Sequence, residues 1–121
     1  MQTPWGEFPV GDAHIHFFSQ AFFSSLSAQS GRPVDELARF LGWRVHYSCE
    51  DLAEAWRNEL DEYGLAQAAL ISSIPGDEDS VATAVSLYPD RFYGFFMANP
   101  AAPDGVERIQ RALAGGRLQG I

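Results

Sequence analysis

Polar and apolar residues alternate in the first strongly patterned stretch of the chain, residues 10–18, which reads VGDAHIHFF. The stretch is short and rich in strand-forming residues, so it predicts a β-strand. Side chains of a strand alternate between two faces, which places Asp12, His14 and His16 on one face and the apolar residues between them on the other. This division is unusual for a buried strand and marks the stretch as a place to look for chemistry.

The clearest helix signal covers residues 48–63. Ser48 is a good N-cap residue, and Asp51 follows three positions later, close to the capping-box pattern. Gly64 stands where helices commonly end in the left-handed conformation. The apolar side chains of the packing face repeat every four residues: Leu52, Trp56 and Leu60.

Two more helices and three more strands complete the pattern. Apolar runs at residues 67–74, 92–98 and 118–121 predict strands, the first of them buried on both faces. Residues 77–87 and 104–113 predict helices. Strands and helices that alternate strictly predict an α/β fold with a parallel sheet and right-handed crossovers.

The chain has 121 residues, of which 46% are hydrophobic, and this composition fits one globular domain. Its 16 acidic and 8 basic side chains give a net charge of −8, which argues against nucleic-acid and membrane-surface partners. No apolar run approaches the roughly 18 residues that span a bilayer. Cys49 is the only cysteine, so no internal disulfide can form. A cytoplasmic protein is therefore expected.

Two histidines at positions i and i+2 of one strand project side by side, so His14 and His16 are candidate ligands of one metal ion. Imidazole suits zinc and other transition metals. A catalytic zinc typically has three protein ligands and a water, so a further ligand is needed. Asp12, on the same predicted face, is a candidate partner that fixes the tautomer of a ligand. The alternative is a chance pair of histidines on a partly exposed strand.

These residues carry a family resemblance. The Asp-x-His-x-His pattern that closes the first strand resembles the amidohydrolase superfamily. A second stretch, residues 87–100 with the sequence LYPDRFYGFFMANP, precedes a helix and a Gly-Ile pair. It is similar to the corresponding stretch of the amidohydrolase-related group, which includes aminocarboxymuconate-semialdehyde and resorcylate-type decarboxylases and lactone hydrolases. The resemblance covers nearly the whole chain, from about residue 10 to residue 121.

The resemblance implies the N-terminal half, about four βα units, of a TIM (β/α)₈ barrel with parallel strands. A complete barrel needs roughly 200 residues or more, so residues 1–121 are expected to be a single partial domain cut within its fourth strand. The resemblance also implies a divalent metal, usually zinc and sometimes manganese, held by His14 and His16. A histidine of a later strand and a proton-handling aspartate of the last strand would complete the site. Neither is among these residues, and His46 does not replace the histidine by homology.

The resemblance further implies a metal-dependent hydrolase that acts on a small carboxylate, lactone or amide through a metal-activated water with a pKa of roughly 7. A metal-dependent decarboxylase of an aromatic or muconate-type carboxylate is the alternative. The catalytic acid–base group is unknown in either case, and this chain alone is expected to be inactive. A second alternative is a non-catalytic half-barrel that binds metal or self-associates through open sheet edges. A flavodoxin-like domain is a weaker alternative, because no glycine-rich loop follows the first strand.

Residues 19–47 carry weaker signals, and a short helix is expected between Pro33 and Gly42. In a barrel this segment lies over the catalytic mouth. Arg44 is therefore a candidate to bind a substrate carboxylate, against the alternative of a solvated surface arginine. Asn99, at the end of the third strand, is a further candidate to point into the same site.

Other notable residues have simpler interpretations. Cys49 stands at a helix start, where a thiolate is favoured, but is interpreted as an inert, half-buried cysteine. Arg91 is interpreted as the partner of a nearby acid or as a helix cap. Four phenylalanines line an aromatic-substrate pocket or, more simply, pack in the core: Phe17, Phe18, Phe22 and Phe23.

Overall fold

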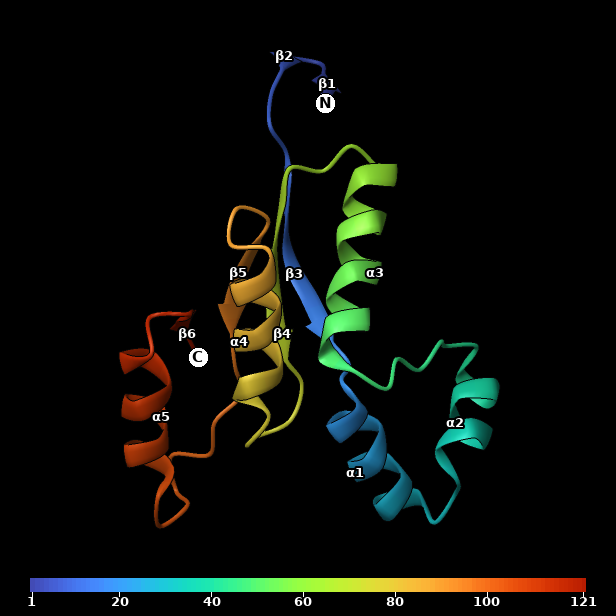
Figure 1. The fold of residues 1–121 in the computed structure, drawn as a ribbon, viewed down its shortest axis with the longest axis vertical. Helices are drawn as coiled ribbons and strands as arrows, with labels where there is room; N and C mark the ends of the chain where they lie inside the picture. Colours follow the sequence, from blue (N-terminus) through green and yellow to red (C-terminus); the bar gives the residue numbers. More distant parts are fainter.

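The computed structural model describes residues 1–121 and contains a parallel sheet of four strands (Figure 1). Its strands are β3 (Gly11–Phe17), β4 (Gln67–Ser72), β5 (Phe92–Phe95) and β6 (Leu118–Gly120). Each strand pairs with the next strand along the chain. The predicted α/β class and parallel sheet are confirmed, although β4 and β5 end two and three residues earlier than expected.

Each connection between neighbouring strands contains a helix that crosses back along the sheet. These helices are α3 (Cys49–Glu62), α4 (Glu78–Leu87) and α5 (Gly105–Ala114). All three agree with the sequence prediction to within one residue at each end. At the start of α3 the Ser48 hydroxyl accepts a hydrogen bond from the Asp51 N–H at 3.0 Å, so the predicted capping residue does begin the helix.

One face of the sheet carries the hydrophobic core. Ala68, Leu70 and Ser72 of β4 are buried, whereas the residues between them are only half-buried. The prediction that this strand is buried on both faces is therefore wrong, because α3 and α4 pack against one face only. On the other face Tyr93 of β5 is 45% exposed. A parallel sheet with helices packed on one face is compatible with a half-barrel, since a doubly wound sheet carries helices on both faces.

Gly94 lets α4 lie close to the middle of the sheet. A Cβ atom at this position would come within 2.7 Å of the Leu118 side chain and 3.0 Å of methyl groups of Val81 and Val85. These distances are well below the roughly 3.5–4.0 Å of an ordinary carbon–carbon contact, so the packing depends on a residue without a side chain.

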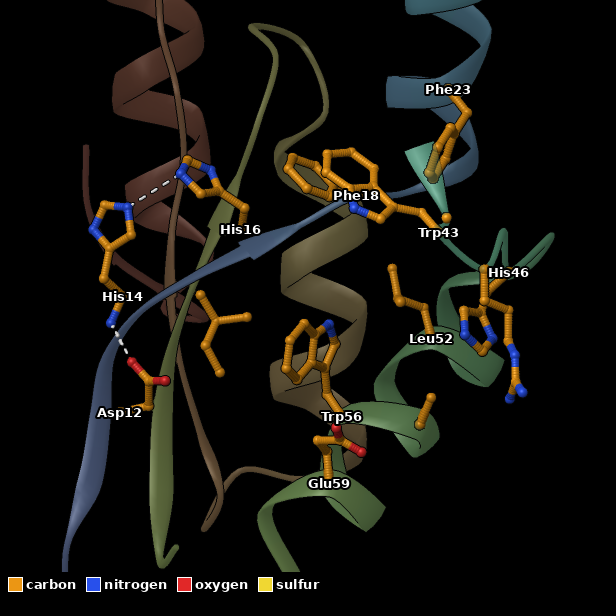
Figure 2. Close-up of a pocket in the computed structure, with 14 residues that line it drawn as sticks. Asp12, His14, His16, Phe18, Phe23, Trp43, His46, Leu52, Trp56 and Glu59 are labelled. Carbon is orange, nitrogen blue, oxygen red and sulfur yellow. Dashed lines mark hydrogen bonds between the residues drawn. The ribbon is translucent and has the colours of Figure 1, made fainter. Parts of the chain in front are cut away.

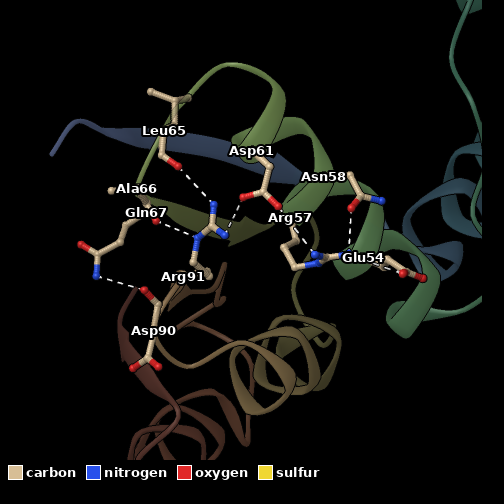
Figure 3. Close-up of polar contacts among 9 residues, drawn as sticks. All are labelled: Glu54, Arg57, Asn58, Asp61, Leu65, Ala66, Gln67, Asp90 and Arg91. Carbon is tan, nitrogen blue, oxygen red and sulfur yellow. Dashed lines mark hydrogen bonds and ion pairs between the residues drawn. The ribbon is translucent and has the colours of Figure 1, made fainter. Parts of the chain in front are cut away.

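Arg91 ties together the chain segments that lead into β4 and β5 (Figure 3). Its guanidinium donates to the carbonyl oxygens of Leu65 and Ala66 at 3.1 and 2.8 Å. It also pairs with Asp61, in the last turn of α3, at 2.8 Å. The prediction that Arg91 pairs with a nearby acid is confirmed. The pairing fixes one end of the sheet, where both strands begin, to the end of α3.

The sequence did not predict α1 (Gln20–Ser30), which follows β3 directly. Its four serines are spread around the helix, so no clear apolar face marks it. The helix begins because the Ser19 hydroxyl accepts a hydrogen bond from the Phe22 N–H at 3.2 Å. It ends at Gly31, which has a left-handed φ of 70°.

The second helix of this segment, α2 (Val34–Leu41), lies where the sequence predicted it, between Pro33 and Gly42. Tyr47, in the loop that follows, donates a hydrogen bond to Asp35 at 2.7 Å, and this bond raises the pKa of the Tyr47 phenol. We call residues 19–47 the helical lobe. It lies beyond the C-terminal end of β3 (Figure 1).

The first eight residues form an antiparallel hairpin of β1 (Gln2–Thr3) and β2 (Gly6–Glu7), which projects beyond the start of β3 (Figure 1). The Met1 ammonium donates to the Phe8 carbonyl oxygen at 3.0 Å. Such short strands leave no periodic signal, which is why the sequence did not predict them. None of the helices combines the length and the apolar character needed to pass through a membrane.

Candidate metal centre

His14 and His16 of β3 direct their imidazoles toward one another (Figure 2). Their Nε2 atoms are 3.2 Å apart, and the rings meet edge to face with centroids 4.9 Å apart. Two nitrogens that each bind zinc at 2.0–2.1 Å in tetrahedral geometry lie about 3.4 Å apart. The two histidines therefore fit two neighbouring ligand positions of one ion, with little movement.

Ser73 sets the orientation of His16. Its hydroxyl lies 3.2 Å from His16 Nδ1 and 3.4 Å from the Ile71 carbonyl oxygen. A hydroxyl has one proton to donate, and a carbonyl only accepts. When Ser73 donates to Ile71, it accepts from His16 Nδ1–H, which leaves the lone pair of His16 Nε2 free for a metal.

Ser73 is a residue of the candidate site that the sequence patterns did not reveal. The residue follows β4 directly, at the carboxyl end of a parallel strand. Ligand sites of parallel α/β folds lie at these ends, and this position was the available signal.

A bulge interrupts β3 just before the two histidines. Asp12 is in register with Ala68 and Ile15 with Leu70, so Ala13 and His14 together face a single residue of β4. The predicted alternation holds from His14 onward, with His16 exposed and Ile15 and Phe17 buried. It fails for Asp12, because the extra residue shifts the strand out of phase.

Asp12 consequently contacts the backbone of His14 and not a ring. Its Oδ1 atom accepts the His14 N–H at 2.9 Å (Figure 2). It has no hydrogen bond to either imidazole, so the predicted role of Asp12 in fixing a ligand tautomer is not realised in this geometry. The side chain instead stabilises the bulged backbone that carries the first histidine.

A cavity of about 750 Å³ lies beside the histidine pair, between β3, the helical lobe and α3. Arg44 lines it from the loop after α2. Trp56 and Glu59 line it from α3 (Figure 2). Arg44 therefore lies at the cavity beside the histidine pair, and its binding of a substrate carboxylate stays a prediction. The cavity combines aromatic walls with both signs of charge, which suits a small polar molecule with an apolar part.

The structure brings no third metal ligand to the pair. No group of three or more histidine, cysteine, aspartate or glutamate side chains is arranged to hold an ion. His46 lines the same cavity but lies near Leu52 of α3, away from the other two histidines (Figure 2). Asn99 lines a different, smaller cavity, and its Oδ1 accepts the Ala101 N–H at 3.0 Å. The candidate centre is thus a pair of ligands.

A buried carboxylate fixes the loops beside the centre. Asp77 accepts hydrogen bonds from the hydroxyls of Ser19 at 2.5 Å and Ser80 at 3.0 Å, which connects the end of β3 to the loop before α4. Burial raises the pKa of the nearby Cys49 thiol, and the carboxylates of Asp77 and Glu50 raise it further. The raised pKa favours the neutral thiol and agrees with the interpretation of Cys49 as unreactive.

Comparisons with known proteins add no relative: no family model matches the chain, and no curated protein or solved structure shows significant similarity to it.

Proposed function

We propose that this chain supplies the first-strand part of a divalent-metal centre in a metal-dependent hydrolase of the amidohydrolase-related group, on a TIM-barrel scaffold. The convergence of His14 Nε2 and His16 Nε2 at 3.2 Å carries the proposal. Two features support it: a Ser73 hydroxyl that donates to Ile71 accepts from His16 Nδ1–H and so leaves the lone pair of His16 Nε2 available, and the helices pack on one face of the parallel sheet. The centre belongs to an enzyme of the cytoplasm in this proposal.

Zinc is the proposed ion and manganese the alternative. When bound, the ion would act as a Lewis acid toward a substrate carbonyl and would acidify water. The side chains of this chain have separate tasks: His14 and His16 hold the ion, Ser73 fixes the proton of His16, and Arg44 binds a substrate carboxylate. A small carboxylate, lactone or amide is the proposed substrate class.

Decarboxylation of an aromatic or muconate-type carboxylate is a second candidate function. Aromatic side chains line the cavity beside His16, among them Phe18 and Trp43, and Arg44 lies next to them in the sequence. A planar ring with a carboxylate would find both an apolar wall and a cation there. Release of CO₂, as opposed to a hydrolysis product, distinguishes the two reactions.

The 121 residues contain three histidines, and only two of them meet. A catalytic zinc needs a third protein ligand, and the reaction needs an acid–base group. We therefore expect this chain on its own to bind a metal ion without turning over substrate. Turnover by the purified chain that disappears in His14→Ala would contradict this expectation.

Metal titration tests the proposed centre directly. We expect Zn²⁺ to bind the purified chain in isothermal titration calorimetry, and Co²⁺ to show an imidazole-bound absorption spectrum. Both signals should be lost in His14→Ala and in His16→Ala. His46→Ala is the matched control, since His46 lines the same cavity away from the pair, and it should bind as the unchanged chain does. Absence of binding, or binding that survives loss of the pair, would refute the centre.

Sedimentation distinguishes the proposed centre from the non-catalytic alternative. A half-barrel that self-associates through its sheet edges would sediment as an oligomer with or without metal. Sedimentation of the chain at several concentrations, before and after Zn²⁺ addition, gives this answer. A monomer that binds Zn²⁺ through the two histidines supports the proposed role in an enzyme centre over self-association.

A further inference from the structure

An aromatic stack connects His16 to the helical lobe (Figure 2). The Phe18 ring lies nearly parallel to the His16 imidazole, with centroids 5.5 Å apart and 9° between the planes. The same Phe18 ring stacks with Phe22 at 4.3 Å and with Trp43 at 4.9 Å. The stack starts at an exposed metal-ligand candidate and ends on two elements of the lobe, α1 and the loop after α2.

We infer that Phe18 is a positioning residue for His16 and that Trp43 holds Phe18 in place; the inference rests on the proposed metal binding by His16. An exposed imidazole on an edge strand is otherwise free to turn about its side-chain bonds. Ser73 restrains one ring atom, Nδ1, but a single hydrogen bond allows the ring plane to tilt about it. A parallel ring against the imidazole face removes this tilt.

The backbone at the end of α2 places Trp43 against Phe18. Gly42 has a left-handed φ of 69°, and the Trp43 N–H donates to the Ala38 carbonyl oxygen at 2.9 Å. This is the hydrogen bond of a Schellman helix end, which fixes the residue after the glycine. The indole then lies between Phe18, which it stacks on, and Phe23, which meets it edge-on at 6.4 Å. A helix terminus in the lobe thereby determines the geometry at the metal ligand.

Phe18 would affect metal binding only indirectly, through the orientation of the His16 imidazole. Phe18 offers no atom that binds a metal, and its ring contacts His16 only through the stack. Partners that orient a metal ligand typically change metal affinity by roughly 10–100-fold when removed. A stacking partner belongs at the lower end of this range, so we expect a loss of about tenfold.

The test compares Phe18→Leu, which removes the stack, with Phe18→Tyr, which keeps it. Phe40→Leu is the matched control, because Phe40 belongs to the same lobe but is 76% exposed and outside the stack. In the metal-free chain, proton NMR of the His16 ring reports the stack through the ring current of Phe18. We expect the His16 ring-proton shifts to move in Phe18→Leu and to stay in place in Phe18→Tyr and Phe40→Leu.

Calorimetric titration with Zn²⁺ supplies the second measurement. Phe18→Leu should bind about tenfold more weakly than the unchanged chain, while Phe18→Tyr and Phe40→Leu stay within about twofold. Trp43→Leu should shift the same His16 protons part of the way and weaken binding less than Phe18→Leu. If Phe18→Leu does not fold, Trp43→Leu serves as the test in its place. Unchanged His16 shifts and unchanged Zn²⁺ affinity in Trp43→Leu would then overturn the positioning role of Phe18.

The outcomes separate this inference from the proposed function. Equal Zn²⁺ affinity in the unchanged chain and a folded Phe18→Leu, with the His16 shifts altered, overturns the positioning role and leaves the metal centre standing. No Zn²⁺ binding by the unchanged chain overturns the metal centre, and the positioning role with it, even where the NMR shifts show the stack. Loss of affinity in Phe18→Leu that Phe18→Tyr also shows would indicate a general packing defect and would refute positioning by the ring face.

Discussion

The polar side chains at the two ends of the sheet differ in their hydrogen-bond partners. Where β4 and β5 begin, the Arg91 guanidinium donates to two backbone carbonyl oxygens and to Asp61, all within the chain (Figure 3). Where β3 ends, His14 and His16 are exposed and direct their Nε2 atoms at each other (Figure 2). The Arg91 guanidinium thus finds its partners within the chain, whereas the two histidine Nε2 atoms face only each other.

In barrel folds the two ends of the strands also have different roles. Residues at the start of the strands maintain the fold, while residues at the carboxyl ends of the strands bind and react. Removing a group at the first end should therefore cost stability, and removing a group at the second end should cost binding. The following substitutions test whether the two ends are as separate as the structure indicates.

Replacement of Arg91 should have the largest effect. Arg91→Ala leaves the Leu65 and Ala66 carbonyl oxygens without their donor and Asp61 without its partner, and its side chain is only 25% exposed. Hydrogen bonds to charged groups contribute about 1.5–3 kcal/mol, so we expect unfolding free energy to fall by about 2–3 kcal/mol in urea denaturation. Zn²⁺ affinity should not change.

Arg111→Ala is the control for that substitution. Arg111 pairs with Glu107 on the surface of α5, with both side chains more than 70% exposed. Exposed pairs contribute about 0–1 kcal/mol, so its loss should be close to the error of the measurement. If Arg91→Ala weakened Zn²⁺ binding as well as stability, the two ends would be coupled and the proposed separation would be wrong.

Asp77 tests whether the carboxyl end also contributes to stability. Asp77→Ala leaves the buried hydroxyls of Ser19 and Ser80 without this acceptor, and we expect a loss of about 2 kcal/mol in urea denaturation. Removing a negative charge near Cys49 also lowers the pKa of its thiol, because the carboxylate opposes thiolate formation. More thiolate at a given pH means faster alkylation by iodoacetamide, which is followed by mass spectrometry.

Glu50→Gln is the control for Asp77→Ala. It also removes a carboxylate that raises the pKa of the Cys49 thiol, so alkylation should be slightly faster. Glu50 is exposed on the first turn of α3 and accepts no buried hydroxyl, so stability should stay within about 0.5 kcal/mol. Equal stability of Asp77→Ala and Glu50→Gln would show that the buried hydrogen bonds contribute little.

Ser73→Ala should have the smallest effect on stability and a selective effect on binding. The change removes the hydrogen-bond partner of His16 Nδ1, so we expect Zn²⁺ affinity to fall about tenfold while stability stays within about 0.5 kcal/mol. Ser24→Ala, at an exposed position of α1, is the control and should change neither quantity. Unchanged affinity in Ser73→Ala would mean that His16 does not depend on this serine for its tautomer.

The sequence predicted most elements whose signals are local. The capping serine and the four-residue repeat place α3 correctly, because both act within a few residues of the helix they define. The histidine pair also follows from local alternation, since side chains two positions apart on a strand project from the same face. Some contacts between distant segments escaped prediction.

Three such features concern the candidate site. The bulge at Ala13 depends on pairing with β4, more than fifty residues later, so alternation within β3 alone wrongly groups Asp12 with the histidines. The contact of Ser73 with His16 joins residues 57 positions apart. The aromatic stack includes Phe22 of α1, a helix whose serine-rich sequence gives no periodic signal.

The bulge before His14 also bears on which changes of length the chain can accept. Two residues of β3 face one residue of β4 there, so the strand already contains one residue more than its neighbour. A deletion of Ala13 would remove this surplus and leave His14 and His16 on their present face. A deletion of Ile15 would turn one imidazole away from the other, since each single-residue shift moves a side chain to the opposite face. We therefore expect a one-residue deletion just before His14 to keep the histidine pair together, and a one-residue deletion just after it to separate the pair.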